Sequence, residues 1–124
     1  VAKVSPPENY VVDGFALQDQ LNDQKNVKRD EQFLNHFPHG NHRPNYFTSL
    51  VKSDWKIIYH YQIEDKPRYE LFNLKHDPFE VNNLVDNNPE QLKIMMKVLS
   101  NEMKSKKALP PEKEKRALEL IIPR

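Results

Sequence analysis

Cysteine is absent from the sequence, and only two of its 124 residues are glycine. Without cysteine the chain has neither a thiol nucleophile nor a thiolate metal ligand, and its redox compartment cannot be inferred. Two glycines exclude a phosphate-binding glycine loop, and the sequence contains no Gly-x-Ser-x-Gly nucleophile element. These absences leave no familiar nucleophilic or phosphate-binding motif in the chain.

Long apolar runs and an excess of charge are also missing. Apolar runs extend over only a few residues, far short of the roughly 20 needed to cross a bilayer. The 19 basic and 18 acidic residues leave a net charge of +1, so neither nucleic acid nor a membrane is expected as a partner. The first residue is Val1 and no signal-peptide core follows, so we expect the sequence to begin inside a longer protein.

An antiparallel sheet is predicted for residues 31–75. A short mixed run ends at Pro38, and two β-rich runs over 46–52 and 55–61 are separated only by Ser53 and Asp54, which is typical of a tight hairpin. A further run over 68–74 returns as the next strand. Alternation within 55–61 places four apolar residues on one face: Trp55, Ile57, Tyr59 and Tyr61. We therefore expect a meander of three or four strands with one apolar face and one wet face.

A helix is predicted after the sheet. Asn88 stands where a cap is needed, Pro89 at the first helical position and Gln91 at the third. An apolar stripe follows at helical spacing: Leu92, Met95, Met96, Leu99 and Met103. This stripe should pack on the apolar face of the sheet. The predicted fold class is therefore α+β, a small four-stranded antiparallel sheet with a C-terminal helix packed on one face.

The organisation of the chain divides into three parts. Residues 1–30 read as a polar connecting segment, 31–109 as the folded unit and 110–124 as a tail. Between sheet and helix, Phe79, Val81 and Leu84 are expected to anchor a loop into the core. The apolar end of the tail, residues 118–122, is expected to dock either on this unit or on a part of the protein outside this sequence.

Three histidines lie within seven residues of one another and are the first candidates for chemistry. His36, His39 and His42 are followed directly by Arg43, and Pro38 and Gly40 predict a loop there. Imidazoles are common metal ligands, but this spacing matches no standard zinc pattern. Two other interpretations stay open. The segment is either a solvated or interface loop, or a rim where His and Arg donors contact an anionic substrate.

Other polar and aromatic groups have simpler explanations. Glu64 with Asp65, and Asp77 with Glu80, could serve as acid–base pairs, but carboxylates at such positions commonly form turns and caps. The aromatic residues among 55–61 could form a sugar-stacking platform. Their alternation with polar residues favours a place in the core instead.

Three motifs resemble elements of the sulfatase family. Residues 12–17 (VDGFAL) are similar to its D-G-x-x-L element, and residues 46–59 (YFTSLVKSDWKIIY) to its R-x-G-D-W-K-L-I-Y hairpin. Residues 69–84 (YELFNLKHDPFEVNNL) resemble Y-E-L-Y-N-L-x-x-D-P-x-E-x-x-N-L. The resemblance covers nearly the whole chain. One departure lies in the hairpin, where Ser53 stands in place of the turn glycine.

The resemblance implies a C-terminal subdomain of an enzyme that hydrolyses sulfate esters, expected to be those of a sulfated carbohydrate. Sulfatases resemble alkaline phosphatases in a large N-terminal domain, where a Cys/Ser-x-Pro-x-Arg residue becomes formylglycine and a calcium ion neutralises the sulfate. Neither centre can be carried onto this chain, whose nearest segment, residues 5–9 (SPPEN), ends in Asn9 in place of arginine. No catalytic residue and no metal or cofactor is therefore expected in this chain, which alone should be inactive.

The same resemblance sets the expected partners and location. The chain should contact its own N-terminal catalytic domain, and in isolation could self-associate through the surface that this domain would cover. The loop from His36 to Arg43 is the candidate substrate-binding border of the cleft. A periplasmic or secreted location is expected by resemblance. The alternatives are a stand-alone binding or interaction module with the same small fold, and a metal-binding domain that uses the histidine loop.

Overall fold

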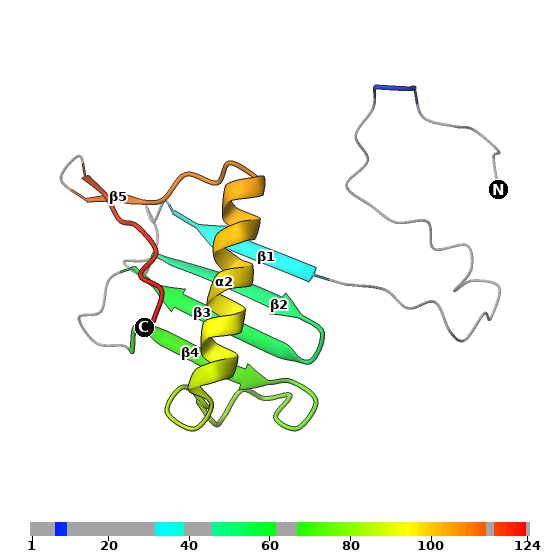
Figure 1. Ribbon diagram of the computed structural model, residues 1–124, viewed down its shortest axis with the longest axis vertical. Helices are drawn as coiled ribbons and strands as arrows, with labels where there is room; N and C mark the ends of the chain where they lie inside the picture. Colours follow the sequence, from blue (N-terminus) through cyan, green and yellow to red (C-terminus); the bar gives the residue numbers. More distant parts are fainter. Residues whose placement is uncertain (1–6, 10–31, 39–45, 62–66, 114–115, 124) are drawn as a thin grey trace.

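A four-stranded sheet forms the centre of the molecule. The computed structural model describes residues 7–9, 32–38, 46–61, 67–113 and 116–123. Strands β1 (Gln32–Phe37), β2 (Phe47–Lys52), β3 (Trp55–His60) and β4 (Tyr69–Asn73) pair in the order β1-β2-β3-β4, and every pair is antiparallel (Figure 1). The predicted meander and the predicted fold class are both confirmed.

The hairpin between β2 and β3 is the tightest turn of the sheet. Lys52 pairs with Trp55, so Ser53 and Asp54 alone connect the strands. Ser53 has a φ of 52°, in the left-handed region that a two-residue hairpin favours and that glycine enters most easily. This is the position where the sulfatase pattern has glycine. The serine therefore retains the turn geometry at a small conformational cost.

One face of the sheet carries the core. The register aligns Leu34, Leu50, Ile57 and Leu71 in one row across the four strands. Helix α2 (Pro89–Ser105) lies across this face (Figure 1). It buries the five residues of the predicted stripe there: Leu92, Met95, Met96, Leu99 and Met103. The helical stripe and the apolar row together exclude water from a single layer of side chains, which is the main stabilising contribution in a chain of this size.

The ends of α2 use backbone hydrogen bonds. Asn88 occupies the N-cap position but makes no side-chain capping bond, so the predicted side-chain cap is wrong. The C-terminal end closes with the amides of Lys107 and Ala108, which donate to the carbonyls of Lys104 and Met103. Lys107 has a φ of 51°. These features define a Schellman motif, which ends the helix before the two prolines at 110–111.

The loop between β4 and α2 departs from the prediction. Leu84 packs against the core, but Phe79 and Val81 are 87% and 75% exposed, so these two side chains are not anchors. The loop is held by hydrogen bonds instead. The amide of Leu84 donates to Leu71 O, and the side-chain oxygen of Asn83 accepts from the Leu71 amide. Backbone pairing thus replaces the expected burial of apolar side chains.

The opposite face of the sheet is not the wet face that was expected. Its residues include Phe33 and Phe37, which are exposed, and Phe47, Val51 and Ile58, which are partly buried. Polar side chains also lie on this face. Apolar residues therefore line both sides of the sheet, although α2 covers only one.

The segment after α2 returns to the sheet. A short two-stranded ribbon, β5 (Glu112–Lys113) with β6 (Arg116–Ala117), reverses the chain, and Leu118 and Leu120 then pack against the core. The apolar end of the tail therefore contacts this unit. Within the described ranges, no helix has the length and apolar character needed to cross a membrane.

Truncation of a buried side chain of α2 tests the packing against the sheet. Leu99→Ala should lower the free energy of unfolding by about 2–5 kcal/mol, because Leu99 is fully buried and its loss leaves a cavity. Ile94→Ala on the same helix is the control, since Ile94 is largely exposed. Urea titrations followed by tryptophan fluorescence measure both, and equal effects would contradict the described packing.

Candidate functional site

His36 is the one member of the histidine–arginine segment that the structure describes. It lies in β1, not in a loop, and both of its ring nitrogens are hydrogen bonded. Nε2 lies 2.7 Å from the carbonyl oxygen of Leu109, and Nδ1 lies 2.7 Å from Oγ1 of Thr48. Because a carbonyl can only accept, Nε2 carries a proton, whereas the direction of the bond between Nδ1 and the Thr48 hydroxyl depends on the protonation of the ring.

The hydrogen bonds of His36 continue into the core. Thr48 is fully buried, and its hydroxyl also lies 3.0 Å from that of Tyr61, which in turn contacts the sulfur of Met103 on α2. Burial raises the pKa of Tyr61 above its usual value, the bond with Thr48 opposes this shift, and nearby Tyr59 adds to it. Tyr61 therefore remains a protonated phenol near neutral pH, suited to donating a hydrogen bond and not to acting as a base.

Three of the four predicted site residues, His39, His42 and Arg43, lie outside the described residues. The proposed border therefore stays a prediction, and His36 uses its nitrogens within the domain. In the described part of the chain, no group of three histidine or acidic side chains is arranged to hold a metal ion.

The tyrosines of β3 and β4 attach the C-terminal segment. The hydroxyl of Tyr59 donates to the carbonyl of Glu119, and accepts from the Ile121 amide and from Nη1 of Arg68. Tyr69 donates to the carbonyl of Ile121 over 2.8 Å. Burial, and then the neighbouring Tyr59, raise the pKa of Tyr69, so this donor also keeps its proton. The aromatic face is therefore core, as predicted, and the hydroxyl of Tyr59 binds the backbone of the tail.

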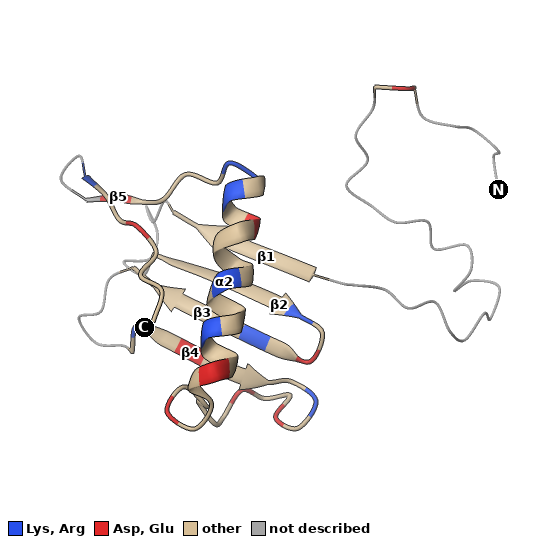
Figure 2. Cartoon of the chain, viewed as in Figure 1, with Lys and Arg blue, Asp and Glu red and all other residues tan. Residues whose placement is uncertain are grey.

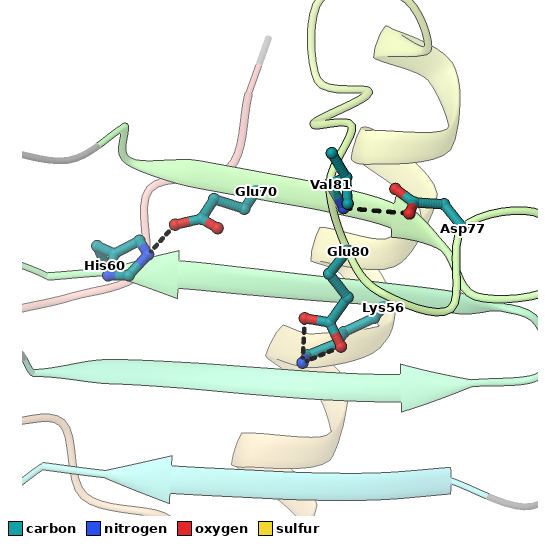
Figure 3. Close-up of polar contacts among 6 residues, drawn as sticks. All are labelled: Lys56, His60, Glu70, Asp77, Glu80 and Val81. Carbon is teal, nitrogen blue, oxygen red and sulfur yellow. Dashed lines mark hydrogen bonds and ion pairs between the residues drawn. The ribbon is translucent and has the colours of Figure 1, made fainter.

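The carboxylate of Asp77 organises the loop before α2. It accepts hydrogen bonds from the amide of Asn82 at 2.8 Å and from that of Val81 at 3.1 Å, the second of which is drawn in Figure 3. These backbone bonds lower the pKa of Asp77. The prediction that this aspartate forms a turn is confirmed.

Two charged or polar pairs lie on the second face of the sheet, which is the face opposite α2 (Figure 3). Nζ of Lys56 on β3 lies 2.7 and 2.6 Å from the two carboxylate oxygens of Glu80. Nε2 of His60 lies 2.7 Å from Oε1 of Glu70. Sequence reasoning missed both pairs, because alternation places Lys56 and His60 on one face of the strand but does not identify their partners. No local signal connects Lys56 with a loop residue 24 positions away.

These polar groups make hydrogen bonds and ion pairs within the domain. The imidazole, the phenols and the carboxylates described above each bind another group of the same domain. Every buried side-chain nitrogen or oxygen in the described part of the chain has a hydrogen-bond partner. The arrangement therefore holds strands, loop and tail together.

The comparison with protein families identifies the chain. The family described as N-sulphoglucosamine sulphohydrolase, C-terminal, matches residues 1–108. The fold is a sheet with one packed helix, and the motifs of the hairpin and of β4 lie within the matched range. The class of protein is thus a sulfatase C-terminal domain. The chain belongs to the N-sulphoglucosamine sulphohydrolase C-terminal family.

Two solved structures share this fold. One, described as BT4656 in complex with its substrate D-glucosamine-2-N,6-O-disulfate, has a TM-score of 0.65 and 22% identity, covering 90% of this chain and 23% of its own. The other, BT33336S-sulf, comes from work on glycosaminoglycan metabolism by Bacteroides thetaiotaomicron. It has a TM-score of 0.54 and 19% identity, and the match covers 81% of this chain and 22% of its own. This chain therefore spans less than a quarter of either relative. No curated protein gives a significant match.

Replacement of Asp77 tests the loop cap through pH. The pKa of Asp77 is lower in the folded chain than in the unfolded chain, where it is about 3.9. The contribution of its carboxylate to stability is therefore complete above that unfolded value and is lost as the pH falls through the folded pKa. Asp77→Ala should therefore be less stable than wild type near neutral pH, and the difference should shrink below about pH 4. Urea unfolding between neutral and acidic pH measures this, with exposed Asp86→Ala as control. A difference that is independent of pH would contradict the cap.

Removal of one phenol tests the attachment of the tail. Tyr69→Phe deletes the bond to Ile121, which should favour opening of the tail by about 1 kcal/mol and speed tryptic cleavage after Arg116 by about fivefold. Tyr46→Phe is the matched control, because the Tyr46 hydroxyl has no hydrogen bond within the described ranges. Equal cleavage rates for wild type and Tyr69→Phe would exclude the role of this bond.

Proposed function

We propose that this chain is the C-terminal subdomain of an enzyme that hydrolyses sulfate esters of a sulfated carbohydrate. The observation that carries the proposal is the family match over residues 1–108, because it covers every strand of the main sheet and the whole of α2. The substrate bound in one of the similar structures, a disulfated glucosamine, supports the carbohydrate class. N-sulfated or O-sulfated glucosamine is the substrate type to test first.

Catalysis belongs to the N-terminal part of the full-length protein. The relatives are more than four times as long as the segment they share with this chain, which leaves room for a separate catalytic domain. Formylglycine and calcium are assigned to that domain. The residues described here include neither a cysteine nor a group of acidic side chains that fits calcium. No chemical step is therefore assigned to a residue of this chain.

The substrate-facing role of this domain is assigned to residues 39–43. His39, His42 and Arg43 supply donors that suit a sulfate group. His36 is assigned a positioning role, since its bonds to Thr48 and Leu109 fix the end of β1 from which this segment continues. A periplasmic or secreted location belongs to the same proposal and is supported by the glycosaminoglycan context of one relative.

The full-length protein provides the test. It should release sulfate from D-glucosamine-2-N,6-O-disulfate, whereas this chain alone should not, and its N-terminal sequence should contain Cys/Ser-x-Pro-x-Arg. Sulfate release measured by ion chromatography is the readout, with Ala at the first residue of that motif as the inactive control. A full-length protein that binds the sugar without releasing sulfate would support the stand-alone binding module instead.

The border assignment is tested in the same protein. Combined His39→Ala, His42→Ala and Arg43→Ala should raise KM by about tenfold or more, with a smaller change in kcat, because charge-assisted hydrogen bonds to the substrate are lost. An unchanged KM would remove the border assignment while leaving the sulfatase proposal intact.

Zinc titration of the wild-type chain tests the metal-binding alternative.

A further inference from the structure

The second face of the sheet has a regular composition of side chains. Pairing places three rows on it, and they are Phe33–Val51–Lys56–Phe72, Asn35–Ser49–Ile58–Glu70 and Phe37–Phe47–His60. In the first and third of these rows, the residues contributed by β1 and β2 are all phenylalanine or valine. This face is therefore apolar along β1 and β2, and mixed along β3 and β4.

The apolar part of this face is open. Phe33 is 59% and Phe37 53% exposed, and the ring of Phe37 lies 4.9 Å from that of Phe47. At the other end of the face, Glu80 reaches Lys56 from the loop that also carries exposed Phe79 and Val81. Single exposed apolar residues are ordinary, but phenylalanines gathered on one sheet face indicate a surface that another body covers.

The charged groups of this face are already paired within the domain. Lys56 binds both oxygens of Glu80, and His60 binds Glu70, as Figure 3 shows with α2 behind the strands. Burial of an unpaired charge would be costly, whereas a pair that satisfies its own hydrogen bonds can be covered at a much lower cost. The charged residues of the second face therefore oppose its burial less than unpaired charges would.

The outer side of α2 has the opposite character. Lysines recur along it at positions 93, 97 and 104, followed by 106 and 107, and basic positions mark the helix along its length (Figure 2). Lys97, Lys104, Lys106 and Lys107 are exposed. This side is suited to water, so the two sides of the domain differ in what they can contact.

We propose that the second face, defined by Phe33, Phe37, Phe47, Val51 and Ile58, is the surface on which the N-terminal catalytic domain docks, with α2 turned to solvent. The proposal rests on the proposed function, because it takes the remaining length of the protein to be that domain. The occupant follows from the length of the relatives, since this chain spans 23% and 22% of them and most of each relative lies outside the shared segment.

Hydroxyl-radical labelling with mass spectrometry compares this chain alone with the full-length protein. Burial of Phe33 from its 59% exposure should reduce its labelling by about fivefold in the full-length protein, with a similar fall for Phe37. Ile94, 54% exposed on α2, is the matched control and should label equally in both. Equal labelling of the two phenylalanines in both proteins, or protection of Ile94 in their place, would overturn the proposal.

Substitutions test the same surface through the unfolding temperature of the protein. Phe33→Glu with Phe37→Glu should lower the temperature at which the full-length protein unfolds by several degrees, yet leave that of the chain alone nearly unchanged. Ile94→Glu should leave both unchanged. A different labelling result would assign the face to a second copy of the chain and overturn the proposal. Phe33 would then become more protected as the concentration of the chain alone rises, and would not be protected in the full-length protein.

Sulfate release separates this inference from the proposed function. A full-length protein with protected phenylalanines but no sulfatase activity would overturn the function and retain the interface. An active protein with fully labelled phenylalanines would overturn the interface and retain the function.

Discussion

Contact between the apolar stripe of α2 and the row of leucine and isoleucine on the sheet is the constraint on which the structure depends. A chain with 37% hydrophobic residues can fill only one layer, and this layer uses most of its large buried side chains. The strands could not hold their register without it, because a small sheet with an uncovered apolar face is marginally stable. The tyrosine contacts of the tail and the hydrogen bonds of His36 are built around the edges of this layer.

Several polar side chains in this domain hold its segments in position. His36 connects β1 to the chain beyond α2, Asp77 shapes a loop, and two phenols hold the tail. Membership of a sulfatase family therefore fits a division in which chemistry and framework lie in different parts of the protein.

Much of the fold could be predicted from the sequence because local and periodic signals agreed. The two-residue hairpin, the alternation of residues 55–61 and the helical stripe each specify one arrangement, and all three appear as expected. The failures involve residues whose fate depends on distant partners. Phe79 and Val81 looked like anchors because they are apolar, yet Glu80 between them reaches across the sheet to Lys56. Similarly, Asn88 has the residue type of a cap but not the side-chain bond.

The candidate site was less predictable than the fold. His36 was grouped with its neighbours by spacing alone, whereas its partners Thr48 and Leu109 are 12 and 73 positions away. Spacing along the chain carries no information about such contacts. The apolar residues of the second face were not anticipated for a related reason, since alternation within one strand shows which of its residues share a face and not what the neighbouring strands add to that face.

The closing contacts of the tail bear on where this domain can be cut for recombinant work. The family match ends at residue 108, but Leu118, Leu120 and the backbone of residues 119 and 121 complete the packing around Tyr59. A fragment ended at the family boundary would strip the tail from Tyr59, whose buried hydroxyl would then retain only Arg68 as a partner, and would uncover the apolar groups beside it. Domain limits drawn from sequence similarity alone would thus omit a part of the folded unit.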